Sequence, residues 1–175
     1  MKLIKIKNKE INQLLIDKIC KFKMKFWKYN FNSQLNFFYE NHNSNDLHFI
    51  LVNNNRILAY NVLKKRIFTK IEKSKNNIKK YFFLFDSFLV DENYRNQNLG
   101  SKHLKENKIY LKKVGKPGFL LCKKKLINFY KKNGWNLIIN KNFKVKNYKK
   151  KKHLMSFNFN LSKKNVSTKF TLNLK

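Results

Sequence analysis

One segment, residues 81–101, constrains the fold of this chain more than any other. Its first half, Tyr81-Phe-Phe-Leu-Phe-Asp-Ser-Phe-Leu-Val90, is apolar on both faces, which is typical of a central β-strand. A polar turn follows, and residues 99–114 then have helical character, stopped by Gly115 and Pro117. A helix that begins after a buried strand presents unpaired backbone N–H groups, so the segment predicts a site for a phosphate or pyrophosphate. An ordinary strand-turn-helix connection is the alternative.

The rest of the chain alternates between strand and helix patterns. Apolar runs and alternations predict strands at 3–6, 47–52, 57–63, 118–122, 135–139 and 155–161, and helical spacing predicts helices at 11–22 and 126–130, with a second helix or an irregular packing segment at 26–39. Residues 64–80 are mostly charged, and we expect strand ends and a loop there.

The predicted order is β-α-α-β-β-β-α-β-α-β-β, which indicates an α/β fold of the α+β type with a mixed sheet. We expect a single domain over residues 1–163. Residues 164–175 are predicted to be a C-terminal extension, in which the alternation over 166–174 adds an edge strand.

The net charge of +32 says less about partners than its size suggests. Proteins that read nucleic acids use Arg heavily, but only Arg56, Arg66 and Arg95 are Arg among the 41 basic residues. Asn, Ile and Phe are also abundant, while Ala59 is the only alanine, which is the pattern of an AT-rich genome. We favour this bias over selected polyanion binding. Either way, the surface attracts anions, including nucleic acids, without specificity and in a salt-dependent manner.

Several classes of protein are not expected from this sequence. No apolar run approaches the roughly 20 residues of a membrane span, and the N-terminus lacks the apolar stretch of a secretory signal, so we expect a cytoplasmic protein without membrane contact. Cys20 and Cys122 have no metal-ligand or disulfide spacing, so we expect no metal site and two buried thiols. A monomer and a homodimer are both compatible with the sequence.

Two blocks of the sequence resemble the GNAT superfamily of N-acetyltransferases. The strand end at Val90 and the turn Asp91-Glu-Asn-Tyr94 are followed by Arg95-Asn-Gln-Asn-Leu-Gly100, which is similar to the family's R/Q-x-x-G-x-G/A motif. Phe129-Tyr130-Lys-Lys-Asn-Gly134-Trp135 resembles the family's second block and lies about 30 residues further on. One departure is that Asn98 stands where the family has its central Gly. Asn is the residue after Gly that best tolerates left-handed backbone, so we expect the loop to form.

The resemblance implies that acetyl-CoA binds along the first block as co-substrate. The main chain of Phe88, Leu89 and Val90 would pair with the pantetheine arm, and Arg95 would contact a phosphate. The implied pyrophosphate loop consists of Arg95, Asn96, Gln97, Asn98, Leu99, Gly100 and Ser101, with the backbone amides of residues 97–101 as donors.

The same resemblance implies two catalytic residues. Tyr130 occupies the position of the general acid that protonates the leaving thiolate; the alternative is a packing residue on a buried helix face. Asp86 is the only carboxylate in the aromatic strand, four residues before Val90 and therefore on the same face. We expect burial to raise its pKa towards that of a general base; the alternative is an Asp satisfied by the backbone or a nearby Lys. Ser87 is expected on the opposite face.

The function that the resemblance implies is transfer of an acetyl group from acetyl-CoA to a primary amine by direct attack. We expect a small-molecule acceptor. Acetylation of a protein or peptide amine is one alternative, and a catalytically weakened GNAT-fold basic binding protein is the other. The segments expected to select the acceptor are residues 26–46 and 64–80.

Overall fold

The structure is a computed structural model that describes residues 1–71, 77–139, 143–146, 152–159 and 168–174. The chain divides into two compact units. Unit 1 contains Met1–Lys64 and Phe85–Asn107, and unit 2 contains Lys65–Leu84 and Lys108–Lys175. Two long strands and one helix contribute residues to both units.

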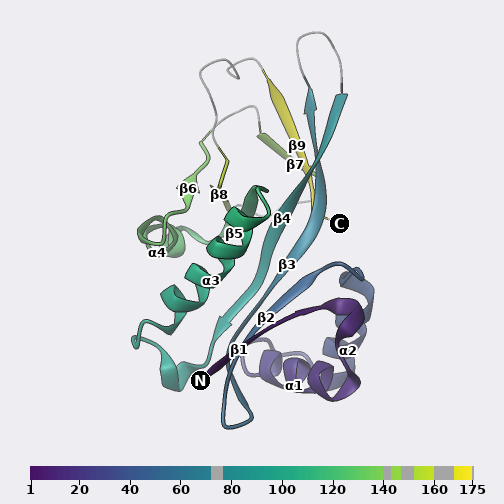
Figure 1. Cartoon of the computed structure of the whole chain (residues 1–175), viewed down its shortest axis with the longest axis vertical. Coiled ribbons are helices and arrows are strands. Elements are labelled where there is room, and N and C mark those ends of the chain that lie inside the picture. Colours follow the sequence, from purple (N-terminus) through teal and green to yellow (C-terminus); the bar gives the residue numbers. More distant parts are fainter. Residues whose placement is uncertain (72–76, 140–142, 147–151, 160–167, 175) are drawn as a thin grey trace. The chain divides into compact units, whose positions relative to one another are not determined.

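The described residues form nine strands and four α-helices, which Figure 1 labels. The strands are β1 (Lys2–Lys7), β2 (Leu47–Asn53), β3 (Arg56–Ile71), β4 (Asn77–Val90), β5 (Gly118–Cys122), β6 (Asn136–Leu137), β7 (Phe143–Lys146), β8 (His153–Phe157) and β9 (Lys169–Asn173). The helices are α1 (Gln13–Met24), α2 (Phe31–Asn41), α3 (Leu99–Lys113) and α4 (Ile127–Lys132). The strands form one mixed sheet in the order β1-β2-β3-β4-β5-β8-β6, and β9 pairs with both β3 and β7.

Unit 1 is an antiparallel β1-β2-β3 sheet with two short helices. The residue pairs Ile4–Ile50 and Ile50–Tyr60 set its register. Both helices begin at an Asn cap: the side chain of Asn12 accepts a hydrogen bond from the Leu15 N–H at 3.0 Å, and that of Asn30 caps α2 in the same way. Figure 1 shows α1 and α2 next to each other, close to β1 and β2.

The core of unit 1 forms where the apolar faces of α1 and α2 meet the sheet. Its buried members include Ile19, Phe22, Phe38, Ile50 and Tyr60. Burial of each large apolar side chain contributes about 1.5–3 kcal/mol, so this packing, more than helix propensity, holds two short helices in place.

Unit 2 combines parallel and antiparallel strand pairs. β4 runs parallel to β5 through the pairs Phe83–Gly118 and Leu84–Phe119, and β8 lies antiparallel to both β5 and β6. Its core is strongly aromatic and includes Phe68, Phe82, Phe119 and Phe170. β9 is antiparallel to β3 and parallel to β7.

The predicted fold class and the order of elements through β6 are confirmed. Residues 64–71 and 77–80, where strand ends and a loop were expected, all belong to β3 and β4, so both strands extend further than the apolar pattern indicated. The tail strand is present at Lys169–Asn173, but it is not an edge strand. It pairs with β3 and also with β7, a strand that the sequence did not predict. The proposed boundary at 163/164 and positions 166–167 lie outside the described residues. Among the helices in the described ranges, none is long and apolar enough to cross a membrane.

Candidate functional site

Strand β4 loses its regular alternation at Ser87. This residue has a φ of 56°, in the left-handed region, and its N–H donates to Asp86 Oδ1 at 2.8 Å. Consecutive residues of a regular strand point to opposite faces, but Asp86 and Ser87 line the same cavity. A single left-handed residue within a strand has this effect, as in a β-bulge. The prediction that Ser87 faces away from Asp86 is therefore wrong.

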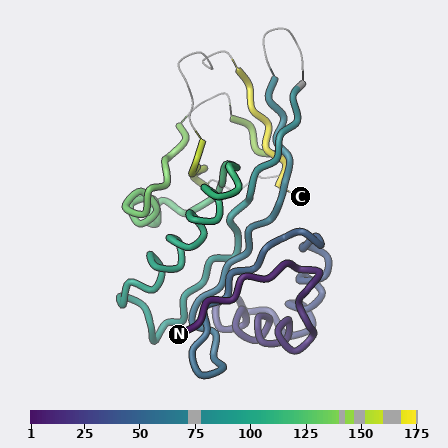
Figure 2. Tube along the Cα trace, viewed as in Figure 1, coloured from purple at the N-terminus to yellow at the C-terminus, as the bar shows by residue number. Residues whose placement is uncertain are grey.

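The last residues of β4 lead directly into the loop before α3, and Figure 2 shows this turn as one continuous trace. Leu89 is part of the core of unit 1. The Phe88 ring stacks on His103, with 5.8 Å between ring centroids. Val90 is half-buried and is the last residue of β4. The three residues expected to bind pantetheine therefore lie immediately before the loop.

Asp91 fixes the start of that loop. Its N–H donates to the Leu58 carbonyl at 2.8 Å, and its carboxylate accepts from the Asn93 N–H at 3.2 Å and from Lys25 Nζ at 2.9 Å. Burial opposes ionisation of the carboxyl, but these hydrogen bonds and the Lys25 charge outweigh it, so the pKa of Asp91 lies below its usual value.

The loop closes onto α3 through two left-handed asparagines. Asn96 and Asn98 have φ values of 63° and 59°, the backbone geometry that Gly supplies most easily. The Asn98 carbonyl accepts the Lys102 N–H at 3.0 Å, which begins the helical hydrogen-bond pattern. The amides of residues 99–101 precede this bond, and the first turn of a helix leaves such donors without partners inside the helix. Asn98 therefore adopts the left-handed conformation that its residue type tolerates.

Arg95 and Gln97 make surface contacts within the loop. Arg95 Nη2 lies 2.9 Å from Glu92 Oε1, and both side chains are more than half exposed, so the ion pair contributes little. Gln97 Nε2 donates to the Asn93 carbonyl at 3.4 Å. A phosphate that approached the loop could replace Glu92 as the partner of Arg95.

A buried hydrogen-bond network fixes the start of α3 against β3. The side chains of Asn61, His103 and Asn107 are all buried. Asn61 Oδ1 accepts from His103 Nε2 at 2.6 Å and from Asn107 Nδ2 at 3.0 Å, and Asn61 Nδ2 donates to Asn107 Oδ1 at 2.9 Å. Burial lowers the pKa of His103 to about 4, so the ring is neutral near pH 7.

Asp86 is ion-paired. Its Oδ2 lies 2.8 Å from Lys64 Nζ, with 39% of the Asp86 side chain and 6% of the Lys64 side chain exposed. Burial raises the pKa of the carboxyl, but Lys64 and the Ser87 amide outweigh burial and hold it below its usual value. The expected direction of the pKa shift is therefore wrong, and the alternative, an Asp satisfied by the backbone and by a nearby Lys, is confirmed.

A cavity of about 670 Å³ opens beside Asp86 in unit 1. Its lining combines aromatic, charged and polar side chains: Lys23, Trp27, Tyr29, Ser33, Gln34, Asn36, Phe37, Glu40, Asp86 and Ser87. Lys23 and Gln34 are buried, whereas Tyr29, Phe37 and Glu40 are exposed. We call this space the acceptor cavity below.

Two buried histidines lie near the acceptor cavity. His42 Nδ1 donates to the Phe38 carbonyl at 2.8 Å. His48 Nε2 donates to Asn8 Oδ1 at 3.2 Å, and the Tyr60 hydroxyl donates to His48 Nδ1 at 2.9 Å. Burial lowers the pKa of His42 to about 3 and that of His48 to about 2, so both are neutral near pH 7.

Tyr130 lies on α4 in unit 2, where it is buried. Its ring contacts those of Phe129 and Trp135 at centroid distances of 5.3 and 6.3 Å, and its carbonyl accepts the Trp135 N–H at 3.0 Å. Burial raises the pKa of its hydroxyl, which therefore keeps its proton in neutral solution. A protonated hydroxyl is the form that a general acid needs.

Lys23 and Lys64 are the charged residues of this region that sequence reasoning missed. Both are buried despite their charge. A signal was present: Lys23 falls on the same helical face as Ile16 and Ile19, and Lys64 has the same strand parity as Val62. In a chain so rich in lysine, two lysines at core positions did not stand out.

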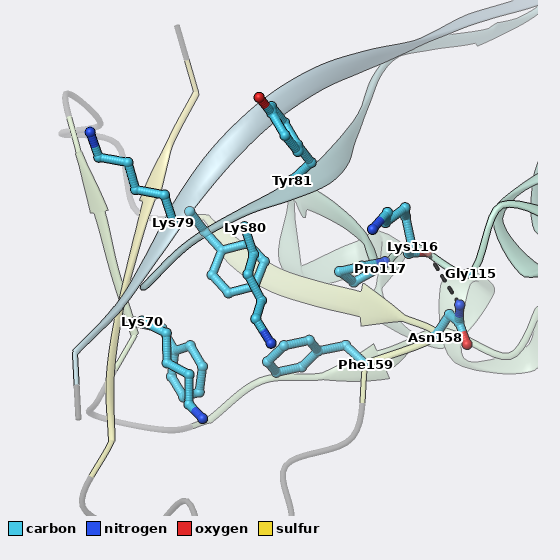
Figure 3. A pocket seen from close by; sticks show the side chains of 11 residues that line it. Lys70, Lys79, Lys80, Tyr81, Gly115, Lys116, Pro117, Asn158 and Phe159 are labelled. Carbon is cyan, nitrogen blue, oxygen red and sulfur yellow. Dashed lines mark hydrogen bonds between the residues drawn. The ribbon is translucent and has the colours of Figure 1, made fainter. Parts of the chain in front are cut away.

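A second cavity, of about 520 Å³, lies in unit 2 (Figure 3). Lysines from β3 and β4, including Lys70 and Lys80, surround aromatic rings there, and Asn158 Nδ2 donates to the Lys116 carbonyl at 3.3 Å. None of the site residues predicted from the sequence lines it. No cluster of His, Cys, Asp and Glu suited to a metal ion was found in the part of the chain that the structure describes.

No family model matches the sequence, and no curated protein sequence matches it. Solved structures are similar over nearly the whole chain. A GNAT-family acetyltransferase from Staphylococcus aureus has 18% sequence identity and a TM-score of 0.61, over 89% of this chain and 98% of its own.

Two further solved structures are of enzymes named for different acceptors. An aminoglycoside 6'-N-acetyltransferase in complex with coenzyme A has 12% identity and a TM-score of 0.62, over 90% of this chain and 96% of its own. The ribosomal-protein-S18-alanine N-acetyltransferase of Escherichia coli has 15% identity and a TM-score of 0.56, over 89% and 92%. The chain therefore has the fold of the GNAT acetyltransferases.

Proposed function

We propose that this protein transfers an acetyl group from acetyl-CoA to a primary amine. The observation that carries the proposal is the segment from Ser87 to Ser101, in which β4 runs into a loop with left-handed Asn96 and Asn98 and then into the N-terminus of α3. The first amides of this 15-residue helix have no acceptor within the helix itself, which favours a pyrophosphate, and the fold is that of acetyltransferases.

The cofactor contacts follow from this segment. The amides of residues 97–101 would hold the pyrophosphate, and the main chain of Phe88, Leu89 and Val90 would pair with the pantetheine amides. Arg95 would exchange Glu92 for a phosphate oxygen. This exchange would cost little, because the present ion pair is exposed and therefore weak, and an Arg–phosphate contact would be charge-assisted as well.

The chemical step would divide between the acceptor and two side chains. The amine nitrogen forms a bond to the acetyl carbon, the carbon–sulfur bond breaks, and the amine loses one proton while the thiolate gains one. Asp86 is ionised at neutral pH, so it would accept a hydrogen bond from the amine or from a water that takes up the amine's proton. Tyr130 would protonate the thiolate, since its hydroxyl keeps its proton well above neutral pH.

We propose a small-molecule acceptor that is not a polycation. One similar solved structure is an aminoglycoside acetyltransferase, and aminoglycosides carry several ammonium groups. The acceptor cavity has Lys23 in its lining, and Lys64 is paired to Asp86 beside it. These buried lysines would repel a second or third ammonium group.

A panel of amines tests the proposal. The purified chain would be incubated with acetyl-CoA and, in turn, with amino acids, aliphatic and aromatic amines, an aminoglycoside and short peptides, and free CoA thiol would be measured. At least one amine should accelerate thiol release tenfold over the rate without acceptor, and mass spectrometry should find one acetyl group on it. If acetyl-CoA binds but no amine accelerates thiol release, the chain is a GNAT-fold binding protein instead.

A further inference from the structure

Two buried ammonium groups, those of Lys23 and Lys64, lie close to Asp86, whereas Glu40, the other carboxylate of the cavity lining, is exposed. Lys64 is paired to Asp86 at 2.8 Å, while Lys23 adds a second ammonium group. Both ammonium groups lie over the Phe37 ring, at 4.7 Å for Lys23 and 5.7 Å for Lys64, so they share one small region. Asp86 can balance only one of them.

Lys23 is also unsatisfied as a hydrogen-bond donor. Its side chain is 1% exposed, and within the described ranges its Nζ has no hydrogen-bond partner. The rings of Phe37 and Trp27, the latter 5.5 Å away, supply cation–π contacts but no acceptor atom. A buried ammonium group without an acceptor is costly, and burial accordingly lowers the pKa of Lys23 to about 8. A buried donor of this kind is suited to bind a ligand that carries a hydrogen-bond acceptor.

The rest of the cavity lining indicates the form of that ligand. Trp27 and Phe37 supply flat apolar surface, and Glu40 is exposed. Asp86, at 39% exposure, is accessible to a ligand and can accept a hydrogen bond from an amine. The cavity thus combines a donor for an anion, an apolar wall and an acceptor for an amine.

We propose that the acceptor is an amino acid with an apolar side chain, whose carboxylate binds Lys23 while its amine lies beside Asp86. This inference rests on the proposed function, because it names the acceptor class of the same site. The carboxylate supplies the missing hydrogen-bond acceptor and places a negative charge beside Lys23. The amide of the same amino acid keeps a carbonyl acceptor but lacks this charge, so the site discriminates against it.

Matched acid and amide acceptors test this proposal by acetyl transfer. Phenylalanine and phenylalaninamide differ only in the carboxyl group, and KM would be measured for each. The acid should have at least a tenfold lower KM in the wild-type chain. In Lys23→Met the two KM values should become equal, because the side chain keeps its length but loses its donor. Lys28→Met removes an exposed charge just beyond α1 and should keep the tenfold ratio.

A binding measurement separates failure of this inference from failure of the proposed function. Phenylpropionate and its amide lack the amine and cannot be acetylated, and the fluorescence of Trp27 reports their binding; Trp27→Phe identifies the signal. If the acid binds more tightly than its amide and Lys23→Met abolishes this preference, the inference is supported even if no amine is acetylated. Acetyl transfer with equal KM for acid and amide, or an acid preference that persists in Lys23→Met, overturns it. Equal binding of both analogues with no transfer at all also overturns it.

Discussion

Mild acid should destabilise this protein before its carboxylates begin to titrate. His42, His48 and His103 are all buried, and burial lowers their pKa values to about 3, 2 and 4. An unfolded His titrates near pH 6.5. Between these values the unfolded chain binds protons that the folded chain does not, so the free energy of unfolding falls as the pH falls from about 6.5.

The size of the effect follows from linkage. Between about pH 7.5 and pH 5.5, each of these histidines costs about 1.4 kcal/mol of stability, because only the unfolded form takes up a proton. For three histidines the loss is about 4 kcal/mol, a large part of the roughly 5–15 kcal/mol of a typical domain. Asp86 and Asp91 also have lowered pKa values, but they begin to cost stability only below about pH 5.

Urea unfolding followed by circular dichroism at the two pH values measures this loss. About 0.3 M NaCl would screen the net charge of +32, so that the unfolded histidines titrate near their usual pKa. His42→Gln should reduce the pH-dependent loss by about 1.4 kcal/mol, whatever its effect on stability at pH 7.5. An unfolding free energy that stays constant, or rises, as the pH falls to 5.5 would show that these histidines are not neutral in the folded protein.

Three substitutions give further expected outcomes. Tyr130→Phe should lower kcat about 100-fold without changing acetyl-CoA affinity, because it removes only the group that protonates the thiolate. An unchanged kcat in stopped-flow or steady-state assays would exclude that role. Asn98→Gly should raise acetyl-CoA affinity about fivefold by removing a Cβ from the loop, while Asn54→Gly, at another left-handed position, should not. Calorimetry that finds equal effects would contradict this. Gly118→Ala should destabilise the chain by about 2 kcal/mol, because the new Cβ would lie 2.7 Å from Leu111 Cδ1, and a melting temperature within a degree of wild type would show that the core adapts.

Local pattern was enough to predict the elements that frame the loop. The run Tyr81–Val90, the turn and the helix from Leu99 each have their signals within a few residues of sequence. The residues from Lys64 to Ile71 were expected only as strand ends beside a loop, because most of their side chains are polar or charged and the pairing of Lys64 with Asp86 is not visible in the local sequence. β7 was missed for the same reason: four residues among lysines become a strand by pairing with β9.

The site shows the same division between local and long-range information. Asn96 and Asn98 could be assigned to left-handed positions, because that preference belongs to the residue itself. The direction of the pKa shift of Asp86 could not be predicted, since it depends on Lys64, 22 positions earlier in the chain. Ser87 is a Ser in a left-handed conformation, which no sequence propensity favours, and this one residue decides which side chains of β4 share the acceptor cavity.

Titration calorimetry with acetyl-CoA is the sharpest test of cofactor binding at this loop. We predict saturable binding of one acetyl-CoA per chain, with Kd on the order of tens of micromolar or tighter at physiological salt, and weaker binding in Gly100→Val. Absence of binding in that range would contradict it. So would binding of many anions per chain that disappears as salt rises, because that behaviour needs only the +32 charge and no loop.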